Sequence, residues 1–391
     1  MNKANDVFMN TYHRLPVVFT RGEGVRLFDA SGKSYLDFSS GIAVNCLGHN
    51  NPALVDAIKK QAEKLIHVCN YYQSDVSEAF AEKLIAVSGL KKLFLCNSGA
   101  EANEGAIKIA RKYSFKKYGK NRHRIVTLTG SFHGRTISTL SATGQDKFHE
   151  NFGPFTEGFV YIPPNDAAAL EKALNDISVC AFFFEPIQGE SGVIPLSADY
   201  LKKAAEICAQ KDILLIADEI QCGLGRTGEF FACNRFNLTP DIATLAKGLC
   251  GGVPAGAVLA GEKTADVLEY DHGSTFGGNA LAAAAGLVVL ETITANGFMD
   301  EIKEKGAFFA DKLDDLELDG FDISRIRGAG LMLGADVSHE DHGLLEKALE
   351  KGLLFLGGGP KTLRFLPPYT ITREEIIEGI SILSEILPKT A

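Results

Sequence analysis

The stretch Ile213-Leu214-Leu215-Ile216-Ala217-Asp218 is an apolar run of strand length that ends in a carboxylate. A second stretch, Ile242-Ala243-Thr244-Leu245-Ala246-Lys247, repeats the pattern and ends in an amine 29 positions after that carboxylate. In an open α/β sheet, side chains at the carboxyl ends of the strands line the ligand crevice. We therefore expect Asp218 and Lys247 to face one bound molecule.

The residues alone leave two interpretations of this Asp–Lys pair open. A lysine that forms a Schiff base, opposite a carboxylate that holds a pyridinium nitrogen, is the arrangement that pyridoxal phosphate (PLP) requires. A structural ion pair explains either residue equally well when it is taken alone, because ion pairs also perturb such groups. Motifs elsewhere in the chain have to decide between them.

Apolar runs of strand length alternate with helical periodicities from about residue 53 to residue 290. This alternation predicts a mostly parallel sheet covered by helices. Short strands and turns are expected between residues 17 and 50, and helices around one strand-like stretch after Gly297. The chain is therefore predicted to be α/β, with a large domain at 53–295, an N-terminal segment at 1–52 and a C-terminal small domain at 296–391.

Composition excludes several functional classes. The 391 residues are 46% hydrophobic and 23% charged, with a net charge of −9, which disfavours binding to a phosphate backbone. The longest apolar stretch, 280–290, is much shorter than the ~20 residues that span a bilayer. The eight cysteines form no C-x-x-C pair, and the histidines show no metal-ligand spacing. We expect a cytoplasmic protein without nucleic-acid, membrane or metal partners.

A phosphate site is predicted where a strand meets a helix at Ser98-Gly99-Ala100-Glu101. Ser98 and Glu101 have the spacing of a capping box, so a helix begins here with the amides of Gly99 and Ala100 unpaired. Free N–H groups and the helix dipole together attract an anion. An ordinary helix cap is the alternative, and for this motif alone it is the simpler one.

Two further strand ends carry functional side chains. Phe132, after the run at 125–128, could stack on an aromatic cofactor, and Arg135 could bind a substrate carboxylate through two parallel hydrogen bonds. Core packing of Phe132 and a solvated Arg135 are the alternatives. Glu185 follows three phenylalanines and needs a partner, because isolated burial of a carboxylate is costly.

The segment Gly223-Leu224-Gly225-Arg226-Thr227-Gly228 satisfies the G-x-G-x-x-G pattern of dinucleotide sites. The preceding strand ends in Asp218-Glu219, which would repel a pyrophosphate, and the following residues do not open a clean helix. We therefore give little weight to a dinucleotide site at these glycines.

Taken together, the motifs resemble those of the class III aminotransferases, a PLP-dependent group of fold-type I. The likeness runs from Asn10-Thr11-Tyr12-His13-Arg14-Leu15-Pro16 and Ser40-Gly41-Ile42-Ala43-Val44-Asn45 through the segments at 97–104, 132–136, 185–192, 218–223 and 247–248 to Gly273-Ser274-Thr275-Phe276-Gly277-Gly278-Asn279 and Arg364-Phe365-Leu366-Pro367-Pro368. The resemblance implies a mostly parallel seven-stranded sheet in the large domain and a small α+β domain built from both chain ends.

The resemblance also assigns roles to the candidate residues. Lys247 would bond the cofactor covalently and move the proton, and Asp218 would keep the ring nitrogen protonated. The cofactor-binding residues would be Ser98, Gly99, Ala100, Phe132, Glu185, Asp218, Ile220, Gln221, Lys247 and Thr275. Thr275 would reach the phosphate of the partner subunit's site, which implies a homodimer.

The implied substrates are N-acetylornithine and 2-oxoglutarate, as in arginine biosynthesis, with ornithine or another terminal amine as the alternative donor. Arg135 would hold the α-carboxylate, Ser274 would lie beside the substrate, and Glu190 would release Arg364 to bind 2-oxoglutarate. The aliphatic Ile42 favours the acetylated donor, whereas Tyr12 favours ornithine. Ala100 and Ala280 depart from the family's frequent threonine and proline.

Overall fold

The computed structural model describes residues 7–340 and 342–389. Its main element is a seven-stranded sheet in the order β4-β12-β11-β10-β7-β5-β6. The strands are β4 (Lys92–Cys96), β5 (Arg124–Leu128), β6 (Phe159–Ile162), β7 (Val179–Phe184), β10 (Leu214–Asp218), β11 (Ile242–Leu245) and β12 (Gly256–Ala260). Strand β12 runs antiparallel to both of its neighbours, and the other pairs are parallel. The prediction of a mostly parallel seven-stranded sheet is confirmed.

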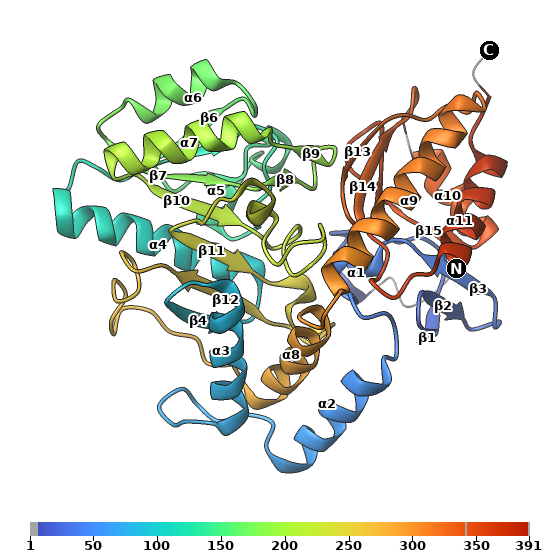
Figure 1. Ribbon diagram of the computed structural model, residues 1–391, viewed down its shortest axis with the longest axis horizontal. Helices are drawn as coiled ribbons and strands as arrows, with labels where there is room; N and C mark the ends of the chain where they lie inside the picture. The colour runs from blue at the N-terminus through green and yellow to red at the C-terminus, as the bar shows by residue number, and fades with distance from the viewer. Residues whose placement is uncertain (1–6, 341, 390–391) are drawn as a thin grey trace.

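Helices cover both faces of this sheet (Figure 1). Alternate side chains of a strand point to opposite faces. Phe183 accordingly packs with residues of α4 (Gly99–Tyr118), whereas Phe182 packs with residues of α7 (Ala198–Lys211). All six residues of β7 are therefore buried, as expected of a strand covered on both sides. The remaining helices on the sheet are α5 (Ile137–Ala142) and α6 (Ala167–Leu174).

The most apolar stretch of the chain forms α8 (Ala280–Ile293), which packs against α2 (Pro52–Lys64) and α3 (Asp75–Ser88). Among the described residues, no single helix has the length and apolar character needed to cross a membrane. Helices α8 and α9 (Phe298–Leu318) pass that test together by length and composition only, and they are bent by 74° at their junction.

The two ends of the chain meet in a smaller α+β unit. One sheet has the order β1-β2-β3-β15, and its parallel pair sets Leu36 of β3 beside Leu353 of β15. A second sheet has the order β13-β14-β17-β16. The elements are β1 (Phe19–Glu23), β2 (Arg26–Asp29), β3 (Ser34–Asp37), β13 (Ser324–Ala329), β14 (Met332–Asp336), β15 (Leu353–Leu354), β16 (Leu356–Gly357), β17 (Thr362–Phe365), α10 (His342–Lys351) and α11 (Arg373–Ile386). The boundaries at 52/53 and 295/296 stay a prediction.

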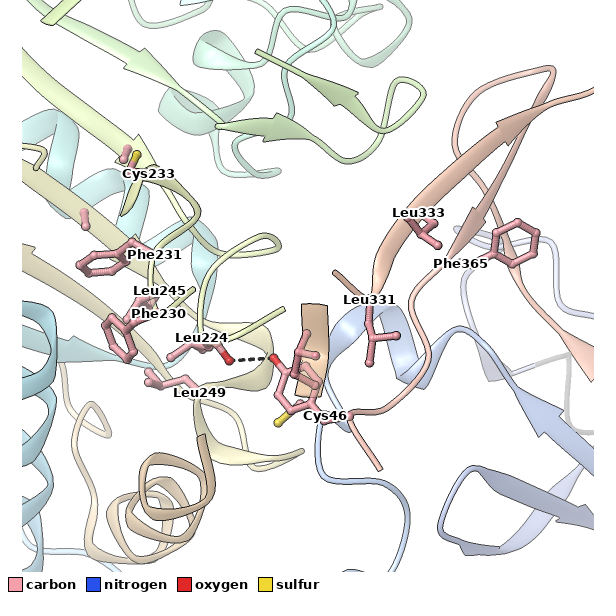
Figure 2. Close-up of a cluster of buried hydrophobic side chains, with 14 of the residues drawn as sticks. Cys46, Leu224, Phe230, Phe231, Cys233, Leu245, Leu249, Leu331, Leu333 and Phe365 are labelled. Atoms are coloured by element: carbon pink, nitrogen blue, oxygen red, sulfur yellow. Dashed lines mark hydrogen bonds between the residues drawn. The ribbon is translucent and has the colours of Figure 1, made fainter. Parts of the chain in front are cut away.

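One continuous core connects the large sheet to the smaller unit. Figure 2 shows part of it, with Leu245 and Leu249 on one side and Leu331 and Phe365 on the other. The Tyr369 hydroxyl donates a hydrogen bond of 2.8 Å across this region to the carbonyl of Leu224. The core therefore fixes how the smaller unit sits against the strand ends.

The glycines at 223–228 belong to this junction and not to a nucleotide loop. Arg226 is buried there, and its Nη1 donates to the carbonyl of Leu331 at 3.0 Å and to that of Pro367. Only the short 3-10 turn Ala232–Phe236 follows. The glycines at 223–228 lie in turns of this junction.

Candidate active site

A cavity of ≈ 470 Å³ lies at the carboxyl ends of the large-sheet strands. Most of the candidate residues line it, although they come from separate parts of the sequence. They are Ser98, Gly99, Ala100, Phe132, Arg135, Glu185, Asp218, Ile220, Gln221 and Lys247. Strands β10 and β11 pair in parallel with Asp218 opposite Thr244, so the acid and the amine end neighbouring strands, as the sequence predicted.

Three donors hold the Asp218 carboxylate in place. Asn103 Nδ2 and His133 Nδ1 each lie 2.8 Å from Oδ2, and the amide of Ile220 donates to Oδ1 at 3.1 Å. The His133 ring is itself fixed by stacking on Phe183, with a centroid distance of 3.9 Å. These contacts fix the orientation of the carboxylate in the cavity wall.

Sequence reasoning missed Asn103 and His133. A usable signal existed for Asn103, because it lies one helical turn after Gly99 on the helix that begins at the cavity. His133 stands next to Phe132 in a motif already singled out, but nothing local indicates that its ring turns toward Asp218.

Lys247 sits in a strained backbone position directly after β11. Its φ is 47°, in the left-handed region that few residues other than glycine adopt, and it opens a short 3-10 turn. Such strain is frequent at functional sites. Its amine makes no hydrogen bond to the residues that the structure describes, and burial lowers the pKa of Lys247, a shift that Glu190 partly opposes. The amine is thereby more readily deprotonated and available as a nucleophile.

The residues at the start of α4, Ser98 to Ala100, line the cavity. Ser98 caps the helix by accepting from the Glu101 amide at 3.2 Å, but the Glu101 carboxylate bonds the amide of Asn97, at 2.6 Å, instead of closing the box on Ser98. No hydrogen bond within the described chain occupies the amides of Gly99 and Ala100. A side chain at Gly99 would bring a Cβ within 2.8 Å of Ile220 Cδ1, so any larger residue would push the Ile220 side chain from its position in the cavity wall.

Glu185 is buried beside the cavity and finds its partners in the backbone. Its Oε1 accepts from the Phe132 amide at 2.9 Å and its Oε2 from the Gly189 amide at 3.2 Å. Burial, with a smaller contribution from the Asp218 charge, raises the pKa of Glu185 to about 8. The residue links the Phe132 loop to the segment that follows β7.

Arg364 and Glu190 form an ion pair behind Gln221. Arg364 Nη1 lies 2.7 Å from Glu190 Oε1 and 3.1 Å from Gln221 Oε1. Burial by itself would raise the pKa of Glu190, but the adjacent Arg364 charge and hydrogen bond outweigh it, and the net pKa is lowered. The pair is adjacent to the cavity through Gln221 without lining it.

Arg135 is exposed and forms no ion pair with any described residue. Its guanidinium lies 4.2 Å above the centre of the Phe148 ring and 5.6 Å from that of Phe132. Phe148 in turn contacts Phe132 edge-on at 5.8 Å. The two rings therefore support a cation that has no anion of its own.

Besides Glu190 and Arg364, four further candidates lie outside the cavity lining of the single chain. Tyr12 and Thr275 are exposed, and Ser274 Oγ accepts from Asn97 Nδ2 at 3.1 Å. Ile42 is 41% exposed and belongs to α1 (Ser40–Ala43), whose four residues all have positive φ between 42° and 66°. This left-handed turn, which costs ~1–2 kcal/mol per non-glycine residue, leads directly to Val44 in the cavity wall.

The sequence matches the family model described as Aminotransferase class-III over residues 7–387. The chain belongs to this family. The acetylornithine aminotransferase of Caldanaerobacter subterraneus subsp. tengcongensis is 49% identical over 380 residues, covering 97% of this chain and 96% of that protein. The acetylornithine aminotransferase of Aquifex aeolicus is also 49% identical, with 97% and 99% covered.

Solved structures of class III aminotransferases share the whole fold. N-acetylornithine aminotransferase from Stenotrophomonas maltophilia K279a aligns with a TM-score of 0.84 at 40% identity, covering 96% of each chain. The ornithine aminotransferase from Toxoplasma gondii ME49 aligns with a TM-score of 0.93 at 36% identity, covering 97% of this chain and 92% of the other. The predictions of fold-type I and of a PLP-dependent transaminase are confirmed.

The cavity suits PLP as the class III cofactor. It offers an oriented carboxylate in Asp218, an uncommitted amine in Lys247, free amides at Gly99 and Ala100, and apolar walls at Ile220 and Phe132. When bound, PLP supplies the electron sink that stabilises a carbanion at the amine-bearing carbon of a substrate.

Proposed function

We propose that this chain transfers the terminal amino group of N-acetylornithine to 2-oxoglutarate, giving N-acetylglutamate semialdehyde and glutamate, a step of arginine biosynthesis. The observation that carries the proposal is the unpaired guanidinium of Arg135 in the wall of the cavity that also contains Lys247. A planar cation without an acidic partner suits a donor whose carboxylate lies at the end opposite its reacting amine. The two relatives described above are acetylornithine aminotransferases, which agrees with this choice of donor.

In this proposal Lys247 would hold the cofactor covalently and would act as the acid and base that moves a proton at the amine-bearing carbon of the substrate. Asp218, held by Asn103 and His133, would face the ring nitrogen and keep it protonated. Gln221 would bond the phenolic oxygen of the ring, and Phe132 and Ile220 would enclose the ring. Ser98 and the amides of Gly99 and Ala100 would hold the phosphate, and Glu185 fixes the Phe132 loop.

The Glu190–Arg364 pair gives the second half-reaction its own anion site. While the donor is bound, Glu190 neutralises Arg364. When 2-oxoglutarate enters, its second carboxylate replaces Glu190 as the partner of Arg364. Gln221 contacts Arg364 and also lines the cavity, so its side chain connects this ion pair to the space in which the substrate binds.

The active unit in our proposal is a homodimer, in which Thr275 completes the phosphate site of the partner subunit and Ser274 lies beside the substrate. Exposed apolar side chains cluster around these residues, namely Ile66, Tyr71, Tyr72 and Phe276. Asn70 connects the segment at 66–72 to the segment at 274–277, because its Nδ2 donates hydrogen bonds to the carbonyls of Ser274 and Gly277. Burial of this apolar surface would drive association. The cytoplasmic location stays a prediction.

Donor selectivity tests the substrate assignment. We expect kcat/KM to favour N-acetylornithine over ornithine, because the aliphatic Ile42 leaves a charged α-ammonium poorly solvated and tolerates an acetyl group. Ile42→Tyr should shift the ratio toward ornithine by roughly 10- to 200-fold, as is typical of one pocket contact. The φ of 66° at Ile42 is less costly for tyrosine than for a β-branched residue, so the fold should tolerate the change.

The measurement is glutamate formation from 2-oxoglutarate with a panel of terminal amines: N-acetylornithine, ornithine, succinylornithine and succinyl-diaminopimelate. Ile177→Tyr, at a site that is 91% exposed, serves as the control for an added tyrosine. If the wild-type chain prefers ornithine, as Tyr12 would favour, the donor assignment is wrong and the aminotransferase assignment stands.

A further inference from the structure

Another cavity, of ≈ 590 Å³, lies along the outer half of α4, away from the active site at the start of that helix. Helix residues spaced three and four apart line it, including Ile107, Lys108, Arg111 and Lys112, together with the loop 119–123. In Figure 1 the far end of α4 lies at the edge of the large domain, on the side opposite the smaller unit.

The lining is strongly basic in a chain whose net charge is −9. Its cations are Lys108, Lys112, Arg111, Lys120 and Arg122, and its carboxylates are Glu104 and Asp271. Asp271 pairs with Lys112, and Glu104 accepts a hydrogen bond from the Thr136 hydroxyl. In the part of the chain that the structure describes, the other four cations have no carboxylate partner.

Arg111 is a partly buried cation whose hydrogen bonding is incomplete. Its Nη2 donates to the carbonyl of Glu157, and the guanidinium lies 5.3 Å from the centre of the Phe159 ring. Its Nε is buried and has no hydrogen-bond partner. Burial lowers the pKa of Arg111, and the charge of the nearby Glu104 opposes that shift only in part. A half-buried guanidinium in this state gains by binding an anion.

The dipole of α4 does not explain this cluster. Cations in the last helical turn compensate the partial negative charge at a C-terminus, and Lys116 and Lys117 occupy that turn. Arg111 and Lys108 lie well before it, where the dipole effect has faded. The helix end therefore does not account for these two cations. The Lys108 amine is held by the carbonyl of Asp271 at 3.1 Å and lies 2.9 Å from His272 Nδ1, which leaves Arg111 as the one of the two with an unbonded buried N–H.

We propose that this hollow binds a small organic anion that carries at least two negative charges on phosphate or carboxylate groups. Arg111 holds one anionic group with its planar fork, and Lys120, which is exposed and bonds to no described residue, closes on the second. The apolar side chains of Ile107 and Leu268 form a floor for the carbon skeleton. The proposal is independent of the choice of amino donor.

Isothermal titration calorimetry of the PLP-loaded enzyme tests this site, with inorganic pyrophosphate and citrate as separate probes for the phosphate and carboxylate chemistries. We expect at least one probe to bind, and added salt to weaken that binding. Lys120→Met and Arg111→Met should each weaken it about tenfold, the value of one charge-assisted contact. Lys116→Met removes the same charge from the same helix outside the hollow and should leave the affinity unchanged.

Arg135→Met distinguishes binding in this hollow from binding in the active site, because Arg135 lines only the active-site cavity. This variant should leave the affinity for the probe unchanged. Lys120 is exposed, so its variant remains informative if Arg111→Met does not fold. The proposal is overturned if neither probe binds at millimolar concentration, if Lys120→Met binds as the wild type does, or if Arg135→Met abolishes the binding.

Discussion

Replacing Lys247 with alanine should abolish transamination, with a loss of at least ~10⁴-fold, while the protein remains folded. In the proposed mechanism the residue supplies both the covalent bond to the cofactor and the proton carrier, and general acid–base catalysis alone is worth about 10²–10⁴-fold. Its amine makes no hydrogen bond to the described residues, so the alanine variant leaves none of them without a partner.

Glutamate formation measures the turnover of Lys247→Ala, and circular dichroism measures its fold. Lys92→Ala, which removes an exposed lysine paired with Asp266, is the control and should keep full activity. Noncovalent binding of PLP to the Lys247 variant is compatible with the account. Turnover within tenfold of the wild type is not.

Asp218→Asn should lower kcat by about 10³-fold, the usual effect of removing one preorganised electrostatic contact. A neutral amide cannot hold the pyridine nitrogen protonated, so the electron sink weakens although the side chain keeps its shape. Asn103 and His133 remain to orient the substituted side chain.

The neighbouring buried acid provides a matched control for Asp218→Asn. Glu219 accepts from the amides of Ala232 and Cys233, at 2.8 and 2.9 Å, and does not line the cavity. Glu219→Gln should therefore lower the stability of the fold, while the kcat of the folded, PLP-loaded enzyme stays within a few-fold of the wild type. If Asp218→Asn binds PLP and keeps a near-normal kcat, Asp218 has only the structural ion-pair role and the proposed electrostatic role is wrong.

Local sequence patterns were sufficient for the parts of the site that lie at strand and helix ends. The apolar runs before Asp218 and Lys247 predicted parallel neighbours, because a buried strand needs consecutive apolar residues. The S-x-x-E pattern placed the start of α4 at Gly99, although the Glu101 carboxylate turned to Asn97. Both signals act within a few residues of the side chains that they position.

Contacts made by the assembled fold were not predictable in this way. Asn103 and His133 meet Asp218 from 115 and 85 positions away, and the left-handed turn at α1 runs against the backbone preference of Ile42. Strand β16 escaped prediction because it is only two residues long and ends in the glycine run at 357–359. The pairing of Arg364 with Glu190 was anticipated only through the family resemblance.

Borohydride reduction followed by peptide mass mapping tests the central claim most directly, when it is carried out before and after addition of N-acetylornithine without an acceptor. We predict that the mass of reduced PLP is found on the peptide that contains Lys247 before the amine is added, and that it is absent from that peptide afterwards. The account is contradicted if the label is on a different lysine, or if it stays on Lys247 in the presence of saturating N-acetylornithine.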